Sequence, residues 1–306
     1  MKVLVATDKP FAKVAIEGIR QELDGVDYEL VLLEKYTEKK QLLDAVADVD
    51  AMIVRSDIID EEVIQAGKNL KIVVRAGAGY DNIDLKAATQ AGVCVMNTPG
   101  QNSNAVAELV FGLLVMGVRN FYNGSSGTEL KGKKLGIHAY GNVGKNVARI
   151  ALGFGMELLA YDTYSRSEVI NADGIDPTIS VKTLYRYSDI VSIHIPLTDE
   201  TRKLIGKDLL KNMPQGAILV NTARKEVINE PELLEYMLEN PKFKFLTDIK
   251  PDMHEEFVAK VGDRYFSTPK KMGAQTAEAN VNAGIAAAHQ IVDYLKNGNQ
   301  KYRVNG

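Results

Sequence analysis

The sequence predicts an α/β protein made of two doubly wound parallel-sheet domains, and three observations support this fold class. Short runs rich in β-branched residues recur along the chain, with segments of helical apolar spacing between them. This alternation pauses at residues 102–134 and then starts again. The length of 306 residues suits two domains better than one core. Because strands that alternate with helices form βαβ units, both halves are expected to contain parallel sheets.

In the first half, four runs have the composition of strands. They span residues 2–6, 29–34, 51–54 and 71–74. A helix is expected over residues 11–23, where Ile16 and Ile19 contribute to an apolar face.

The middle of the chain separates the two halves. A long helix is expected over residues 102–120, and its nearly all-apolar centre predicts burial on several sides. The polar stretch at 121–134, FYNGSSGTELKGKK, is typical of a linker. Beyond it, strands are expected at 135–139, 157–162, 189–195, 216–221 and 243–248, and a last helix at 276–296.

The charge balance and the cysteine content argue against several classes of function. The chain has 37 basic and 40 acidic residues, so no overall field favours nucleic acid or an anionic membrane. Cys94 is the one cysteine, and its apolar surroundings favour a buried structural thiol over a nucleophile. No spacing of histidines and carboxylates indicates a metal site. With neither a signal peptide nor an apolar run of about 18–20 residues, a cytoplasmic protein is the default expectation.

Residues 135–148, LGIHAYGNVGKNVA, indicate a strand, a tight glycine turn and the start of a helix. Gly141 and Gly144 match the second and third glycines of the dinucleotide-binding pattern G-x-G-x-x-G, and Ala139 takes the place of the first. Asp162 ends the next predicted strand, where a carboxylate can bind a ribose 2′-hydroxyl and repel a 2′-phosphate. These features together predict NAD rather than NADP, whereas the glycine pattern alone would also fit a plain strand–helix turn.

Three arginines follow predicted strands, at the edge where open α/β sheets bind ligands. Arg224 lies in VNTARKEVI, and its planar fork suits a carboxylate or a ketone oxygen. Arg55 and Arg75 end strands of the first half, where together they could bind a phosphate. Each could instead be a surface charge, and Arg224 could cap a neighbouring helix.

Six segments occur in order across nearly the whole chain: VVRAGAGYDNIDLKAA (73–88), NTPGQNSNAVAELV (97–110), AYGNVG (139–144), HIPLTDET (194–201), NTAR (221–224) and MGAQTAEA (272–279). Together they resemble the D-isomer-specific 2-hydroxyacid dehydrogenase family, and they are most similar to its short D-3-phosphoglycerate dehydrogenases of the lysine-bearing subgroup. The resemblance implies an NAD-binding domain, residues 99–279, inserted into a discontinuous substrate domain, residues 1–98 and 280–306. It further implies a homodimer formed largely through the NAD-binding domains, with no regulatory domain after the last helix.

The residues of the site are expected at the following positions. Arg224 would bind the carboxylate and the reacting oxygen of the substrate, in a catalytic pair with Lys271. The other substrate-binding residues are expected to be Arg55, Ser56, Arg75, Ala76 and Gly77. The expected cofactor-binding residues are Ala78, Tyr140, Gly141, Asn142, Val143, Asp162, His194, Pro196, Thr201, Thr222, Ala223, Asp248, Gly273 and Ala274.

Two positions depart from the family pattern. The family has a histidine acid/base five residues before the threonine of its GAxT segment, and counting back from Thr276 gives Lys271. The glutamate that partners this histidine would stand where this chain has Met253. Lys271 is therefore expected to accept the hydroxyl proton of the substrate, provided that Arg224 and partial burial lower its pKa. Counting forward from Pro269 would select Lys270, and two solvated loop lysines are the alternative without catalysis.

The four histidines carry weaker expectations. His138 and His289 are expected to be packed core residues. His194 is expected near the adenosine side of the cofactor, and His254, beside the lost glutamate position, is the rival acid/base.

The expected reaction is hydride transfer between NAD and a D-2-hydroxy acid. The preferred substrate is D-3-phosphoglycerate, oxidised to 3-phosphohydroxypyruvate in the first step of serine biosynthesis. One alternative is a glyoxylate or hydroxypyruvate reductase, which would leave Arg55 without a clear purpose. Another is a non-catalytic protein that senses NADH, which the loss of the histidine–glutamate pair would favour.

Overall fold

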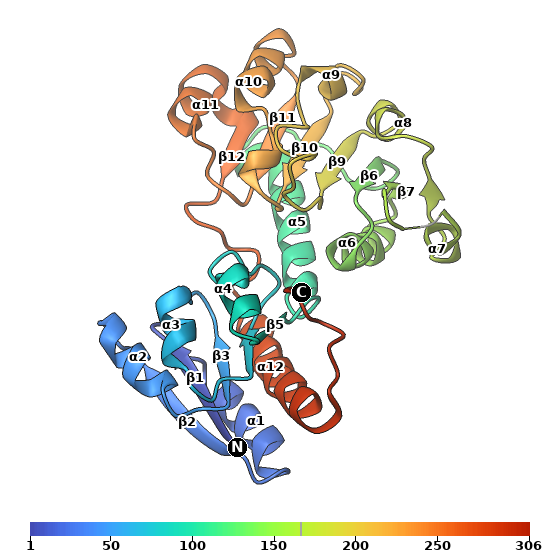
Figure 1. Ribbon diagram of the computed structural model, residues 1–306. Helices are drawn as coiled ribbons and strands as arrows, with labels where there is room; N and C mark the ends of the chain where they lie inside the picture. Colours follow the sequence, from blue (N-terminus) through green and yellow to red (C-terminus); the bar gives the residue numbers. More distant parts are fainter. Residues whose placement is uncertain (166) are drawn as a thin grey trace. The chain divides into compact units, whose positions relative to one another are not determined.

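The computed structural model describes residues 1–165 and 167–306 and divides the chain into two compact units. One, the discontinuous unit, contains Met1–Asn102 and Gln275–Gly306, and the other, the central unit, is Ser103–Ala274. The boundaries between the units thus fall after residues 102 and 274, whereas the boundaries expected from the sequence were after residues 98 and 279. Figure 1 shows both units as sheets with helices on each face.

The discontinuous unit is built on a five-stranded parallel sheet in the order β2-β1-β3-β4-β5. Its strands are β1 (Lys2–Thr7), β2 (Glu29–Glu34), β3 (Ala51–Val54), β4 (Ile72–Arg75) and β5 (Cys94–Asn97). Its helices are α1 (Lys13–Asp24), α2 (Lys39–Val46), α3 (Glu61–Ala66), α4 (Leu85–Gln90) and α12 (Ala277–Asn297).

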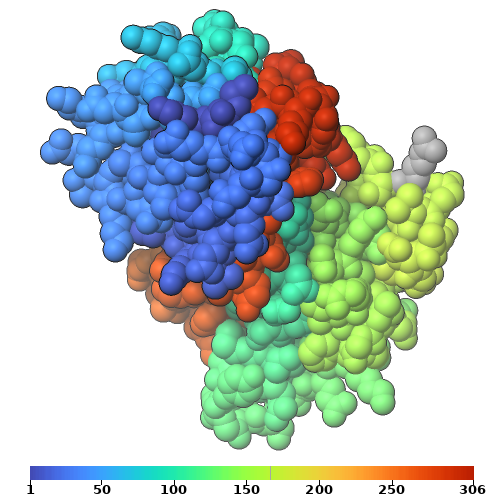
Figure 2. Space-filling model, turned by 90° about the horizontal axis from the view of Figure 1, so that it is seen from below, coloured from blue at the N-terminus to red at the C-terminus, as the bar shows by residue number. Residues whose placement is uncertain are grey.

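Strand side chains alternate between two buried cores, as expected for a sheet covered on both faces. Val3 and Val5 of β1 pack with α1 and α12, whereas Leu4 and Ala6 pack with α2, α3 and α4. The last helix therefore completes a core that the first residues begin, and Figure 2 shows the red C-terminal segment against the blue N-terminal segment. Cys94 is buried in the first of these cores, as predicted.

The edge strand β5 is covered by the C-terminal segment. The Val304 N–H donates to the Val95 carbonyl at 2.9 Å, and the Val95 N–H donates to Asn305 Oδ1 at 2.7 Å. Asn305 Nδ2 donates to the Val93 carbonyl at 2.9 Å. These bonds occupy backbone groups that an exposed edge would leave available for pairing with another chain.

The central unit is built on a seven-stranded parallel sheet in the order β12-β11-β10-β9-β6-β7-β8. Its strands are β6 (Lys134–His138), β7 (Glu157–Tyr161), β8 (Asp176–Pro177), β9 (Ile190–Ile193), β10 (Ile218–Asn221), β11 (Lys244–Thr247) and β12 (Tyr265–Ser267). Its α-helices are α5 (Ser103–Val118), α6 (Asn142–Gly153), α7 (Ser167–Ala172), α8 (Val181–Arg186), α9 (Lys207–Leu210), α10 (Glu230–Glu239) and α11 (His254–Val261). Short 3₁₀ turns are η1 (Asn120–Tyr122), η2 (Lys225–Val227) and η3 (Gly262–Arg264).

The helices of the central unit also form two layers. α5, α6 and α7 pack on one face of the sheet, and α8, α9, α10 and α11 on the other. The polar stretch at 121–134, which has the composition of a linker, connects α5 to β6 inside this unit. Among the described residues, no helix is both long and apolar enough to cross a membrane.

Candidate active site

The strand order of the central unit reverses between β6 and β9, and the glycine turn lies at that point. Ligands of open α/β sheets bind outside the carboxyl ends of the strands, at such a reversal. Ala139 follows β6 with a φ of 81°, a conformation that suits glycine and strains other residues. The alanine that replaces the first glycine of the pattern therefore keeps the backbone shape of a glycine.

The N-terminus of α6 is open to a ligand. Gly141 is its N-cap and no side chain caps the helix, so the first N–H groups keep their capacity to donate. A Cβ atom at Gly141 would meet nothing within 4 Å. A helix N-terminus with free N–H groups and open space in front of it suits a pyrophosphate.

Asp162 organises the loop beyond β7. Its Oδ1 accepts the N–H groups of Tyr164 and Ser165 at 2.6 and 2.8 Å, and its Oδ2 accepts the Tyr140 N–H at 2.6 Å. Each carboxylate oxygen can accept about two hydrogen bonds, so Oδ2 retains capacity for a ribose hydroxyl. Tyr140 itself is buried and donates its hydroxyl to Asp173, so only its backbone could meet a cofactor.

A hollow of about 580 Å³ opens beside this turn. Five of the predicted cofactor residues line it, namely Gly141, Asp162, His194, Pro196 and Thr201. Ala139, Tyr161, Ile195 and Thr198 are further lining residues, and Thr201 donates its hydroxyl to the Pro196 carbonyl at 2.7 Å. The sequence did not single out Thr198 or Glu200 of this wall, because polar side chains in a loop carry no distinctive pattern.

Two neutral histidines form part of this hollow. Burial lowers the pKa of His138 to about 4 and that of His194 to about 3. His138 Nδ1 lies 3.2 Å from the Tyr185 hydroxyl, which fits the predicted packed residue. His194 Nε2 is buried without a hydrogen-bond partner among the described residues, as is Thr222 Oγ1 at the end of β10. Buried polar atoms of this kind are satisfied by a ligand or by water, and their positions fit a dinucleotide at the carboxyl edge of the sheet.

Arg224 and Lys271 meet at one carbonyl. Arg224 Nη1 donates to the Ala223 carbonyl at 3.0 Å, and Lys271 Nζ reaches the same oxygen at 3.4 Å. Asn221, which is buried, closes the turn by donating to the Arg224 carbonyl and accepting the Ala223 N–H. The structure thus brings the two predicted catalytic residues together. Lys271 is exposed, however, so the structure gives no support for the expected partial burial of its side chain.

Asp248 holds the loop that carries Lys271. This fully buried carboxylate accepts the Met272 N–H at 2.7 Å and the Gly273 N–H at 2.8 Å. A Cβ atom at Gly273 would lie 3.0 Å from Asp248 Oδ2, so a glycine leaves room for this approach. The close approach of Asp248 therefore explains why a glycine follows the lysines at position 273, which the sequence alone did not show. Asp248 fixes the loop through two of the loop's backbone N–H groups.

Met253, which stands where the family has a glutamate, is hydrogen-bonded through its backbone to the carboxylate of Glu230. Glu230, at the start of α10, is buried and accepts the N–H groups of Asp252 and Met253 at 3.1 and 2.8 Å. His254 Nδ1 lies 2.8 Å from the Tyr265 hydroxyl. His289 is exposed on α12, 3.3 Å from Glu22, so its prediction as a core residue was wrong.

The arginines of the discontinuous unit lie at adjacent strand ends. Arg75 Nε donates to the Arg55 carbonyl at 3.0 Å, and β3 and β4 pair side by side. Gly77 has a φ of 151°, and a Cβ atom there would lie 1.5 Å from Arg75 Nη1. The positive φ favours glycine at this position, and the guanidinium of Arg75 occupies the space that a side chain would take. Ser56 and Ala78 are exposed beside them, and Ala76 is buried.

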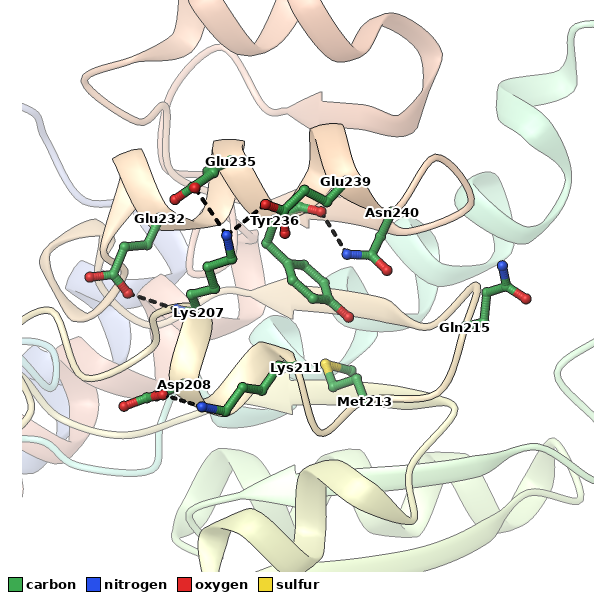
Figure 3. Close-up of a pocket in the computed structure, with 10 residues that line it drawn as sticks. All are labelled: Lys207, Asp208, Lys211, Met213, Gln215, Glu232, Glu235, Tyr236, Glu239 and Asn240. Carbon is green, nitrogen blue, oxygen red and sulfur yellow. Dashed lines mark hydrogen bonds and ion pairs between the residues drawn. The ribbon is translucent and has the colours of Figure 1, made fainter.

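A larger hollow of about 930 Å³ lies between α9 and α10, and Figure 3 shows its lining. Lys207 pairs with Glu235 and Glu239, and Lys211 pairs with Asp208. Gln215 and Asn240 precede β10 and β11, so this hollow borders the amino ends of those strands. Because its charges are paired and it lies away from the carboxyl edge, we assign the site to the hollow beside Asp162.

The central unit therefore has the strand order, the turn and the acidic residue of a Rossmann dinucleotide-binding domain. Residues 116–256 match the family described as D-isomer specific 2-hydroxyacid dehydrogenase, NAD binding domain. The chain is 36% identical over 285 residues to the hydroxypyruvate reductase of Thermotoga maritima, covering 87% of this chain and 92% of that protein. It is 35% identical to the D-3-phosphoglycerate dehydrogenase of Methanocaldococcus jannaschii, covering 84% of this chain but only 52% of that longer protein.

Among solved structures, the NAD⁺-bound 3-phosphoglycerate dehydrogenase of Entamoeba histolytica is similar to this fold with a TM-score of 0.88. The two sequences are 45% identical, and the match covers 100% of this chain and 99% of that one. The chain belongs to the D-isomer-specific 2-hydroxyacid dehydrogenase family, and its cofactor is NAD.

Proposed function

We propose that this enzyme interconverts D-3-phosphoglycerate and 3-phosphohydroxypyruvate. The observation that carries the proposal is the pair of arginines, Arg55 and Arg75, joined through the Arg55 carbonyl at the carboxyl ends of β3 and β4. A phosphate is a ligand that arginine forks bind with two parallel hydrogen bonds. The similarity to the Entamoeba histolytica enzyme over the whole chain supports the same substrate.

Arg55 retains donors for such a phosphate. Its Nη1 donates to the carbonyls of Lys9 and Pro10 at 2.9 and 3.3 Å, and its Nη2 donates to Asn280 at 2.7 Å. A guanidinium has five N–H donors, so these bonds leave about two of them. Two donors are sufficient for a bidentate contact. The sequence-based sets of substrate residues (Arg55, Ser56, Arg75, Ala76 and Gly77) and of cofactor residues remain our assignments.

The chemistry assigned to the central unit needs one cation for the carboxylate and one base for the proton. NAD, when bound, supplies the acceptor for the hydride from C2 of the substrate. Arg224 binds the carboxylate and the reacting oxygen, and Lys271 Nζ takes the hydroxyl proton. Both side chains reach the Ala223 carbonyl, which places the assigned base beside the assigned carboxylate-binding cation. An amine also needs no carboxylate to fix a tautomer, which fits Met253 at the glutamate position.

A second candidate is reduction of hydroxypyruvate or glyoxylate. The hydroxypyruvate reductase of Thermotoga maritima is the relative that favours it, since the match covers most of both chains. These substrates lack a phosphate, so Arg55 and Arg75 would then serve only the fold.

The test is spectrophotometric turnover of purified protein. NADH oxidation with 3-phosphohydroxypyruvate, hydroxypyruvate and glyoxylate, and NAD reduction with D-3-phosphoglycerate, would be compared as kcat/KM. We expect the phosphorylated pair to exceed the others by at least tenfold. A preference for hydroxypyruvate would favour the second candidate. NADH binding without turnover of any substrate would favour a non-catalytic sensor.

We also propose a cytoplasmic homodimer formed through the central unit. Leu152 and Phe154, at the end of α6, are 53% and 39% exposed, and Phe154 stacks on Phe111 of α5. Light scattering on the wild type and on Leu152→Lys would test this assignment, with a shift toward monomer expected for the variant. An unchanged dimer would place the interface elsewhere.

A further inference from the structure

Arg55 is held from three directions within the discontinuous unit. Its Nη1 is bound by carbonyls of the segment after β1, and its plane lies over the Phe11 ring at 5.1 Å from the ring centroid. Its Nη2 is bound by Asn280 Oδ1, at 2.7 Å, which is a short charge-assisted bond. The first two contacts come from residues near the β1 end, whereas the third comes from the last helix.

Asn280 is itself fixed on both sides of its carboxamide. It lies in the first turn of α12, and its Nδ2 donates to the Thr276 carbonyl at 2.8 Å. Thr276 caps the helix by accepting the Ala279 N–H with its hydroxyl at 3.1 Å. Since Nδ2 is already used, Oδ1 must face Arg55, and the amide orientation follows from the bonds.

We propose that Asn280 is a positioning residue that sets the orientation of the Arg55 guanidinium and thereby the preference for a phosphorylated substrate. This inference rests on the proposed function, because it assigns the phosphate to Arg55. Asn280 is neutral, so it fixes Nη2 without cancelling the positive charge. An aspartate at this position would keep an acceptor for Nη2 and pair with that charge, which would weaken attraction for a phosphate dianion. It would also lose the donation from Nδ2 to the Thr276 carbonyl.

The test uses steady-state kinetics with NADH and two substrates that differ in the phosphate. For Asn280→Asp we expect the KM for 3-phosphohydroxypyruvate to rise at least tenfold with kcat within about twofold of wild type. For Asn280→Ala, which releases Nη2, we expect a smaller rise of about three- to tenfold. The KM for hydroxypyruvate should change by less than twofold in both variants.

Asn282→Asp is the matched control, because it adds the same charge two residues along α12 at an exposed position. It should leave both KM values unchanged, which separates a local effect from a change in net charge. Thermal unfolding would confirm that Asn280→Asp folds, as a carboxylate in the first turn of a helix is favourable.

Arg55→Ala, measured in parallel, distinguishes two kinds of failure. If Arg55→Ala raises the KM for the phosphorylated substrate and Asn280→Asp does not, the positioning role is wrong and the proposed function stands. If Arg55→Ala has no effect either, the phosphate assignment fails and this inference fails with it. An equal rise for both substrates in Asn280→Asp would show a structural role and would also overturn the inference.

Discussion

The two sheets are both parallel and doubly wound, yet they present different chemistry at the carboxyl ends of their strands. In the central unit this edge offers backbone N–H groups of α6, small residues and two histidines that burial keeps neutral. In the discontinuous unit the corresponding edge offers the arginines Arg55 and Arg75. The central unit thus suits a large ligand recognised mainly through its shape and pyrophosphate, whereas the discontinuous unit suits a small anion. Variants in each unit can test whether this division of roles holds.

The largest effect is expected from Lys271 in the central unit. Lys271→Ala should lose roughly 10²–10⁴ in turnover, because proton transfer by a positioned base contributes about this factor. NADH binding, measured by fluorescence titration, should be retained. The rate of substrate oxidation should rise with pH in the wild type, and this rise should be absent from the variant.

Lys270→Ala is the control for Lys271. Lys270 is exposed and has no hydrogen bond or ion pair within residues 1–165 and 167–306, whereas Lys271 reaches the Ala223 carbonyl. Its loss should cost little turnover. An inactive Lys270→Ala with an active Lys271→Ala would reverse the assignment, and two active variants would direct attention to His254.

Arg55 tests the other unit. Arg55→Ala should weaken binding of the phosphorylated substrate by roughly 1.5–3 kcal/mol, the range for a hydrogen bond to a charged group. Turnover of hydroxypyruvate should barely change. If kcat/KM falls equally with both substrates, Arg55 supports the fold and the division between the units is not one of substrate selection.

We expect the cofactor preference to depend on Asp162. A carboxylate whose Oδ2 still has capacity for a ribose hydroxyl repels a 2′-phosphate, so NAD should exceed NADP by at least tenfold in kcat/KM, or about 1.4 kcal/mol. Comparable efficiency with the two cofactors would contradict this role. The Arg55→Ala variant should keep the same preference, since the cofactor is assigned to the central unit.

The two buried histidines predict how the stability of the fold depends on pH in the acid range. Their pKa values in the folded state, about 4 for His138 and about 3 for His194, lie below the ordinary value of 6.5. Between pH 6.5 and 4 the unfolded chain binds more protons, so stability should fall as the pH falls, by up to about 1.4 kcal/mol per pH unit for each histidine. Calorimetry at several pH values would measure this slope. His138→Gln should show a shallower slope, and an unchanged one would contradict the assignment to His138.

The smallest effect is expected from the glycine turn. Ala139→Gly should relieve the strain of a φ of 81° and raise stability by about 1 kcal/mol. The transition temperature of the central unit should rise by a few degrees in a thermal scan. A lower temperature would show that the Ala139 methyl group contributes packing that outweighs the strain.

The sequence predicted the fold class well because the recurring short β-branched runs and the glycine turn have strong local signals. The strands expected at 135–139 and 157–162 lie within a residue or so of β6 and β7. Short elements such as α9, with four residues, and β8, with two, were not predicted because so few residues carry no periodicity. The linker-like composition of 121–134 did not mark a boundary between units, because this stretch joins α5 and β6 within one unit.

Residues that act on one another across the fold were the hardest to predict. Counting back from Thr276 pointed to Lys271, but no pattern showed that the buried Asp248 carboxylate binds the Met272 and Gly273 N–H groups. The role of Asn280 depends on a contact with Arg55, a residue 225 positions earlier in the chain. Such contacts leave no local trace in the sequence. The site residues themselves remain predictions until the variants are measured.

The placement of α12 in the discontinuous unit has a consequence for synthesis on the ribosome. Residues 1–102 emerge first, but their α1-side core needs the apolar face of α12 and their edge strand needs Val304 and Asn305. Domains generally fold as units while the chain is being made. The central unit can therefore complete its fold while the nascent N-terminal segment still exposes an unfinished apolar surface. During that interval, this segment is the part of the nascent chain most in need of a chaperone.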